Sequence, residues 1–209
     1  MSATNGPISV LVMDLGGVTC RFDPDRRLAA LSVLSGLAPG TIDQQVFGSG
    51  FDDAGERGRL SPAEFTEQLV ALLALPASPD SDDAVRAAWG LAFEPDPAVL
   101  RIIRTARDRG TRTALLTNNG PLLEHALGAE LSAVGDVLDQ LVFSWRLGVT
   151  KPEPEAFERA AAALGAAPDG IFFVDDSEAN VDAARASGWH AHHFTTALDL
   201  QAALADICR

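Results

Sequence analysis

The order of apolar and polar positions divides the chain into two kinds of region. A short apolar run, Val10-Leu11-Val12-Met13, ends abruptly in Asp14 and a glycine pair, which is typical of a buried strand followed by a tight turn. Residues 21–95 then carry apolar side chains at helical spacing without strand alternation. From residue 96 onward, strand-like and helix-like segments alternate. The pattern predicts an α/β unit interrupted by a helical segment.

Helices in the first region are predicted from periodicity and capping signals. Leucines at positions 28, 31, 34 and 37 form one apolar stripe. Ser61-Pro62-Ala63-Glu64 has the form of a capping box with proline at the first helical position. A further helix is predicted to open at residues 80–83. We therefore expect residues 21–95 to form a small helical cap.

The second region alternates strands with helices. Predicted strands cover residues 111–117, 137–144, 170–174 and 189–194, and predicted helices cover residues 98–109, 122–131, 154–164, 178–186 and 199–207. This alternation produces right-handed βαβ units and a parallel sheet. The predicted fold class is α/β: a three-layer, Rossmann-like parallel sheet formed by residues 1–20 and 96–209, with the cap inserted after the first strand.

Composition narrows the classes of function. The 209 residues include 29 acidic and 16 basic side chains, a formal net charge of −13. That charge disfavours binding to nucleic acid or to an anionic membrane surface. We expect a cytoplasmic protein, because the N-terminal residues have neither a basic signal region nor a long apolar stretch. The expected assembly is a monomer or homodimer. Cys20 and Cys208 are expected to be reduced thiols rather than a disulfide framework.

Candidate chemistry lies where the predicted strands end. Asp14, the pair Thr117-Asn118, Lys151 and the pair Asp175-Asp176 each follow a strand. Taken singly, an aspartate there is often a helix cap or turn residue, and a lysine before proline is often a solvated loop residue. Loops after parallel strands converge on one edge of the sheet, so these side chains can share a cleft.

The residue types at this edge predict phosphoryl chemistry on a magnesium site. Mg²⁺ prefers oxygen ligands, which Asp14, Asp175 and Asp176 supply. Lys151 would neutralise phosphate charge, and Thr117 with backbone N–H groups after Asp14 would bind phosphate oxygens. Asp14 could then attack phosphorus and form an aspartyl-phosphate. The predicted ligand is a small phosphorylated metabolite.

Four motifs carry a family resemblance. They are Asp14-Leu15-Gly16-Gly17-Val18, Leu116-Thr117-Asn118, Lys151-Pro152 and Val174-Asp175-Asp176-Ser177. In this order they resemble the haloacid-dehalogenase-like (HAD) hydrolase superfamily, whose first type of cap is inserted where residues 21–95 lie. The segment Glu56-Arg57-Gly58-Arg59-Leu60-Ser61 is similar to the bacterial sugar-phosphatase branch that includes α-D-glucose-1-phosphate phosphatase.

The resemblance implies a role for each motif. Asp14 would be the nucleophile, with Thr117 and Lys151 as further catalytic residues. Asp14, the Gly16 carbonyl, Asp175 and Asp176 would hold Mg²⁺. The remaining substrate contacts would come from Gly16, Gly17 and Asn118 in the core and from Arg57 in the cap, although an arginine at the end of a helix is more often solvated. The implied substrate is a sugar phosphate.

Gly16 departs from the usual pattern of these phosphatases. Most of them place a second aspartate at this position as general acid and base, and glycine cannot protonate a leaving oxygen. Loss of a positioned acid typically costs about 10²–10⁴-fold in rate. The resemblance therefore favours a substrate with an easy leaving group, and it leaves open a binding protein that has little or no activity. A metal-free haloacid dehalogenase is a further alternative, but it would leave Asp175 and Asp176 without a cation.

Three histidines are a weaker candidate for a metal site. His190, His192 and His193 lie on the last predicted strand, with the first two on one face and the third on the other. Polar residues are expected on an edge strand, so we expect a structural or surface role.

Overall fold

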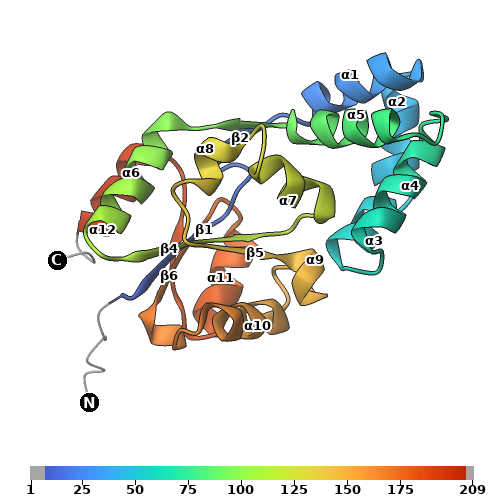
Figure 1. Ribbon diagram of the computed structural model, residues 1–209. Coiled ribbons are helices and arrows are strands. Elements are labelled where there is room, and N and C mark those ends of the chain that lie inside the picture. The colour runs from blue at the N-terminus through green and yellow to red at the C-terminus, as the bar shows by residue number, and fades with distance from the viewer. Residues whose placement is uncertain (1–7, 206–209) are drawn as a thin grey trace.

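The computed structural model describes residues 8–205 (Figure 1). At its centre lies a five-stranded sheet in the order β5-β4-β1-β6-β7, with every neighbouring pair parallel. Its strands are β1 (Val10–Met13), β4 (Arg112–Thr117), β5 (Gln140–Phe143), β6 (Ile171–Asp175) and β7 (His190–His193). The predicted α/β fold with a parallel sheet is confirmed.

Helices cover both faces of this sheet and complete the three layers (Figure 1). One face carries α6 (Pro97–Asp108), α7 (Pro121–Leu127), α8 (Ser132–Gly135) and α12 (Ala197–Ala205); the other carries α9 (Ser144–Leu147), α10 (Pro154–Leu164) and α11 (Glu178–Ala186), with a 3-10 turn, η2 (Pro168–Gly170), before β6. Alternation along β1 serves both layers, since Leu11 and Met13 pack in the first and Val10 and Val12 in the second. A strand buried on both faces therefore appears as an unbroken apolar run.

A helical insert lies between two short strands that leave and re-enter the core. Its elements are α1 (Pro24–Ser35), α2 (Pro39–Ile42), the π-helix η1 (Asp43–Phe47), α3 (Phe51–Glu56), α4 (Pro62–Leu72) and α5 (Pro79–Gly90). The capping box predicted at the start of α4 is present, with Ser61 and Glu64 each bonding the other's backbone N–H. The strands are β2 (Cys20–Phe22) and β3 (Phe93–Pro95), which pair antiparallel. The expectation of no strand within residues 21–95 is therefore wrong at both ends of that range.

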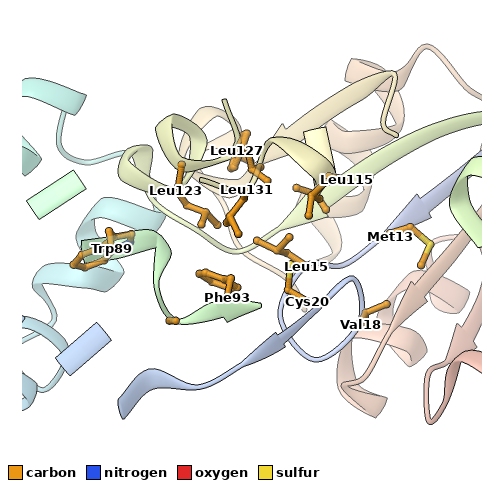
Figure 2. Close-up of a cluster of buried hydrophobic side chains, with 14 of the residues drawn as sticks. Met13, Leu15, Val18, Cys20, Trp89, Phe93, Leu115, Leu123, Leu127 and Leu131 are labelled. Carbon is orange, nitrogen blue, oxygen red and sulfur yellow. The ribbon is translucent and has the colours of Figure 1, made fainter. Parts of the chain in front are cut away.

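One apolar cluster joins the helical insert to the sheet (Figure 2). Trp89 of α5 and Phe93 of β3 belong to the same buried cluster as Leu123 of α7 and Leu115 of β4. Burial of apolar area contributes about 25 cal/mol per Å², so this shared cluster stabilises the insert against α7. The insert is packed on the core as well as connected to it.

Some predicted boundaries in the second half differ from the observed ones. The strand predicted for residues 137–144 begins only at Gln140. The residue before it, Asp139, is instead hydrogen-bonded to Thr113 near the start of β4. The Asp139 carboxylate accepts from the Thr113 backbone N–H at 2.9 Å, and the Asp139 N–H donates to the Thr113 carbonyl at 2.8 Å. The predicted helix over residues 199–207 extends to positions 206 and 207, which lie outside the described residues, as does Cys208.

Other sequence expectations concern the edge strand, the thiols and membrane spans. The three histidines lie on β7, an edge strand, and a ring nitrogen of His193 lies 2.9 Å from the Asp176 carbonyl oxygen. Cys20 is a buried free thiol, and burial, with the charges of Asp14 and Asp96, raises its pKa to about 12. Among residues 8–205, no helix has the length and apolar character needed to span a bilayer.

Gly55 in α3 gives a test of packing within the helical insert. An added Cβ would lie 2.2 Å from Cε2 of Phe65, whose ring stacks on Phe51 at 4.5 Å. We expect Gly55→Ala to lower the free energy of unfolding by about 1–3 kcal/mol through overpacking, measured by urea denaturation. Gly40→Ala is the matched control, because an added Cβ at this helical glycine meets nothing within 4 Å. Equal stability of the two variants would contradict this packing account.

Candidate active site

Asp14 stands at the carboxyl end of the central strand of the sheet. Its N–H donates to the Val174 carbonyl at 2.9 Å, and its carbonyl accepts from the Thr19 hydroxyl at 2.6 Å. The loop then turns back so closely that Gly17 N–H donates to the Cys20 carbonyl at 2.8 Å. These bonds fix the backbone on both sides of the Asp14 carboxylate.

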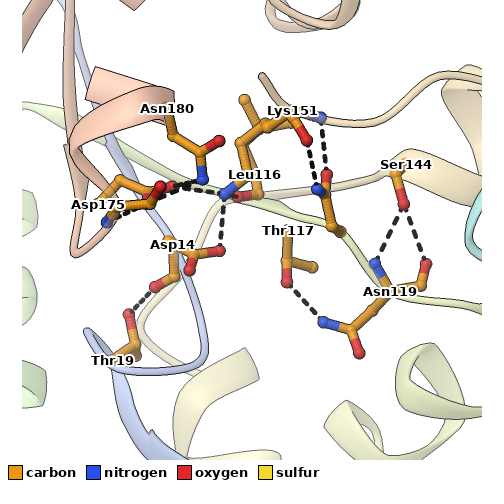
Figure 3. A network of polar contacts seen from close by, with 11 residues as sticks. Asp14, Thr19, Leu116, Thr117, Asn119, Ser144, Lys151, Asp175 and Asn180 are labelled. Atoms are coloured by element: carbon orange, nitrogen blue, oxygen red, sulfur yellow. Dashed lines mark hydrogen bonds and ion pairs between the residues drawn. The ribbon is translucent and has the colours of Figure 1, made fainter. Parts of the chain in front are cut away.

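The ammonium group of Lys151 bonds to residues at the carboxyl ends of three strands (Figure 3). Its Nζ lies 2.8 Å from Asp14 Oδ1, 2.7 Å from Asp175 Oδ2 and 2.9 Å from the Leu116 carbonyl oxygen. The Lys151 side chain is only 2% exposed and that of Asp175 is fully buried. A buried charge is tolerated only when it is paired and hydrogen-bonded, and this ammonium has a partner for each of its three donors.

Asn118 holds the loop that carries Lys151. The Asn118 side-chain oxygen accepts from the Lys151 backbone N–H at 2.9 Å, and its amide group donates to the Lys151 carbonyl at 2.8 Å. The hydroxyl of the preceding residue, Thr117, accepts from Asn119 Nδ2 at 2.8 Å (Figure 3). That arrangement leaves the hydroxyl hydrogen of Thr117 available to donate.

The acidic pair after β6 differs in its surroundings. Asp175 accepts from the Ser177 backbone N–H at 2.8 Å and from Asn180 Nδ2 at 3.0 Å, whereas Asp176 is exposed. Oxygens of Asp14, Asp175 and Asp176 lie within 4.8 Å of one another. The approach of Asp176 depends on Gly17, where φ is +78° and an added Cβ would lie 2.1 Å from Asp176 Oδ2.

Electrostatics at this edge favour a bound cation. Burial, with the nearby charge of Asp175, raises the pKa of Asp14 to about 6 against the opposing pull of Lys151. Burial and Asp175 likewise raise the pKa of Asp176. Burial would lower the pKa of Lys151, but Asp14 and Asp175 raise it. Three carboxyl groups share one ammonium, and an all-oxygen donor set with excess negative charge is chemically suited to Mg²⁺.

A cavity of about 590 Å³ opens above these groups and extends into the helical insert. Its core lining includes Asp14, Gly16, Gly17, Thr117, Asn118, Lys151 and Asp176, and its polar lining from the insert consists of Arg27, Asp43, Asp52 and Glu56. The structure therefore gathers almost all the residues that the sequence singled out. Asp175 lies beneath them as a partner of Lys151.

Arg57 lies elsewhere. Its Nε bonds Asp53 at 2.9 Å and its Nη1 bonds Glu153 at 2.7 Å, and it is not among the described residues that line the cavity. Glu153 also accepts from the Thr150 hydroxyl at 3.0 Å. Arg57 thus connects α3 to the loop that carries Lys151. In this structure it bridges the insert and the core.

Arg27, Asp52 and Glu56 were not singled out from the sequence. Arg27 precedes Leu31 of the apolar stripe by one helical turn, which places both on one face of α1. Glu56 opens the segment that carried the branch resemblance. Neither signal shows that a polar side chain of the insert faces a cavity, because the core residues that line the other side of that cavity are distant in the sequence.

Comparisons with known proteins identify the family. A family model described as haloacid dehalogenase-like hydrolase matches residues 8–188. The phosphatase MT3486 of Mycobacterium tuberculosis is 30% identical over 189 residues, covering 88% of this chain and 86% of that protein. D-ribitol-5-phosphate phosphatase of Bacteroides thetaiotaomicron is 30% identical over 188 residues, covering 87% and 89%.

A solved structure supports the fold. A HAD family enzyme of Bacteroides thetaiotaomicron, in complex with magnesium and inorganic phosphate, superposes with a TM-score of 0.74 at 24% identity, covering 90% of this chain and 94% of that one. The chain belongs to the haloacid dehalogenase-like hydrolases. The predicted enzyme class, a hydrolase of the phosphatase type, is confirmed by the relatives that match nearly its whole length.

Gly17 offers a test of the acidic cluster. We expect Gly17→Ala to cost about 1–2 kcal/mol in stability, because an L-residue is strained at this left-handed conformation. We also expect it to abolish the rise in Tm on adding Mg²⁺, because the new methyl group would displace the Asp176 carboxylate. Gly36→Ala is the control, since Gly36 is also left-handed, at φ +73°, and an added Cβ there meets nothing within 4 Å. An unchanged Mg²⁺ response in Gly17→Ala would contradict this role.

Proposed function

We propose that the protein is a magnesium-dependent phosphatase that hydrolyses a small sugar phosphate through an aspartyl-phosphate on Asp14. The observation that carries the proposal is the Asp14 carboxylate 2.8 Å from Lys151 Nζ, at the floor of a cavity that is also lined by the helical insert. The relative named D-ribitol-5-phosphate phosphatase supports the substrate class.

Mg²⁺ would be held by Asp14, Asp176 and the Gly16 carbonyl, with Asp175 assisting. Support comes from the carboxylate oxygens that lie within 4.8 Å of one another and from the glycine that admits Asp176. When bound, the ion would neutralise phosphate charge and offset the repulsion among the neighbouring carboxylates.

The chain's own residues account for the transfer. The Thr117 hydroxyl and the backbone N–H groups after Asp14 bind phosphate oxygens, and the Lys151 charge attracts them. A carboxylate oxygen of Asp14 attacks phosphorus, the phosphorus–ester oxygen bond breaks, and the leaving oxygen takes up one proton, which the water of the next step replaces. Water then attacks phosphorus, releasing inorganic phosphate and restoring the Asp14 carboxylate.

The lining of the cavity supports a polyhydroxylated leaving group. Arg27, Asp43, Asp52 and Glu56 face it from the helical insert, and carboxyl and guanidinium groups can each bond several hydroxyls. The aromatic rings of Phe47 and Phe93 also line the cavity. The expectation of a cytoplasmic protein without nucleic-acid or membrane partners rests on the net charge of −13 and the sequence pattern.

Replacing the nucleophile tests the covalent route. We expect Asp14→Asn to reduce hydrolysis of p-nitrophenyl phosphate to background, because an amide cannot form the phosphoryl ester, while the circular dichroism spectrum stays native. Asp108→Asn, which makes the same change at an exposed helix end, should retain full activity. Substantial turnover by folded Asp14→Asn would exclude Asp14 as nucleophile.

Metal removal tests the second part of the proposal. We expect hydrolysis of p-nitrophenyl phosphate to cease in EDTA and to return with added Mg²⁺. Asp176→Asn should raise the Mg²⁺ concentration required for half-maximal rate by at least about tenfold, since it removes one anionic ligand. Full activity of a chelated, metal-free enzyme would contradict magnesium dependence.

A further inference from the structure

The core supplies no acid at Gly16, and yet an alkoxide must be protonated as it leaves. Space does not explain the glycine, because an added Cβ would lie in ordinary contact, 3.4 Å from Phe93 and 3.5 Å from Phe22. Among the described residues that line the cavity, the carboxyl groups outside the proposed metal site are Asp43, Asp52 and Glu56 of the helical insert.

We propose that Glu56 protonates the leaving-group oxygen and then serves as base for the attacking water, in place of the acid that Gly16 lacks. The proposal rests on the proposed phosphatase function and deepens it. It assigns to the helical insert one half of the acid–base chemistry.

Glu56 is held against the catalytic loops on both sides. Its backbone lies close to the loop after β4: a Cβ added to Gly120 would lie 3.6 Å from the Gly55 carbonyl carbon and 3.8 Å from Glu56 N. The next residue, Arg57, bonds Glu153 beside the Lys151 loop at 2.7 Å. The end of α3 is thereby fixed between two loops of the active site.

Arg27 provides a second, independent sign that a ligand binds in this half of the cavity. Arg27 is 4% exposed, its Nε donates to the Trp89 carbonyl at 3.0 Å, and its guanidinium carbon lies 4.3 Å from the centre of the Trp89 ring. Its Nη2 is buried and has no hydrogen-bond partner within residues 8–205. A buried donor without a partner is costly, and Arg27 lines the same cavity as Glu56.

Burial and the surrounding charges give two neighbouring carboxyl groups, those of Glu56 and Asp52, different pKa values. Burial, together with Asp52 and Asp53, raises the pKa of Glu56 to about 8, and Arg27 and Arg57 only partly oppose this. Burial raises the pKa of Asp52 to about 6, with Arg27 opposing and Asp53 adding. The pKa of Glu56 therefore lies above that of Asp52, so Glu56 keeps its proton to the higher pH. Environments that separate the pKa values of two carboxyl groups in this way assign one as the acid.

The proton balance closes over one turnover. As the phosphorus–ester oxygen bond breaks, the Glu56 carboxylic acid gives its proton to the leaving oxygen and becomes a carboxylate. The carboxylate next accepts a proton from the water that attacks the aspartyl-phosphate. Inorganic phosphate leaves, Asp14 is again a carboxylate and Glu56 is again an acid.

The test varies the basicity of the leaving group. With Glu56→Gln, we expect kcat/KM to fall by at least about 10²-fold on D-ribitol 5-phosphate, by less on phenyl phosphate, and by less than about threefold on p-nitrophenyl phosphate, whose leaving group needs no proton. Glu67→Gln, the same change at an exposed position on α4, should leave all three rates unchanged.

Each outcome of that series decides a question. An equal loss on all substrates, or no loss on D-ribitol 5-phosphate, would overturn the role of Glu56 while the phosphatase function stands. Wild-type turnover confined to p-nitrophenyl phosphate would also overturn it, because the acid would then be ineffective. No wild-type turnover of p-nitrophenyl phosphate would refute the proposed function itself.

Two further measurements separate proton donation from a structural role. Gly16→Asp in the Glu56→Gln background should recover at least about tenfold on D-ribitol 5-phosphate, but should add little to the wild type. A folded state that keeps Glu56 protonated loses stability as pH rises from about 5 to 8, so the Tm of the wild type should fall relative to Glu56→Gln over that range. Absence of the rescue together with a constant difference in Tm would overturn the proposal.

Discussion

The rest of the site depends on the ion pairs and hydrogen bond made by the buried ammonium of Lys151. It lies 2.8 Å from Asp14, 2.7 Å from Asp175 and 2.9 Å from the carbonyl of Leu116, so one charge connects β1, β6 and β4. Without it, two carboxylates on adjacent strands would repel in a low-dielectric interior. Because all three of its donors have partners, Lys151 would act on a phosphate through its charge while it orients the proposed nucleophile, Asp14.

The core of the site could be predicted because topology places it. The carboxyl ends of parallel strands lie at one edge of the sheet regardless of residue type. The strand pattern alone therefore predicts that Asp14, Thr117 and Asp176 lie near one another. The Asn118 bonds to the Lys151 backbone add precision that the pattern does not contain. They depend on the course of a loop, which local periodicity does not describe.

The half of the cavity formed by the helical insert could not be predicted in the same way. Arg26 and Arg27 are adjacent on α1 and have the same side chain, yet only Arg27 is enclosed. The rings around it come from β2, η1, α5 and β3, namely Phe22, Phe47, Trp89 and Phe93. Strands as short as β2 and β3 also carry too few residues for alternation to be recognised. Burial here is decided by contacts across the chain.

The charges that line the cavity come from both of its halves, the core and the helical insert. The described lining residues include five carboxyl groups, those of Asp14, Asp43, Asp52, Glu56 and Asp176, against the cations of Arg27 and Lys151. A phosphate dianion entering such a cavity would be repelled if every acid were ionised. A proton on Glu56 and a divalent cation beside Asp14 each reduce that repulsion. The proton that Glu56 would donate is therefore also one that helps the substrate to bind.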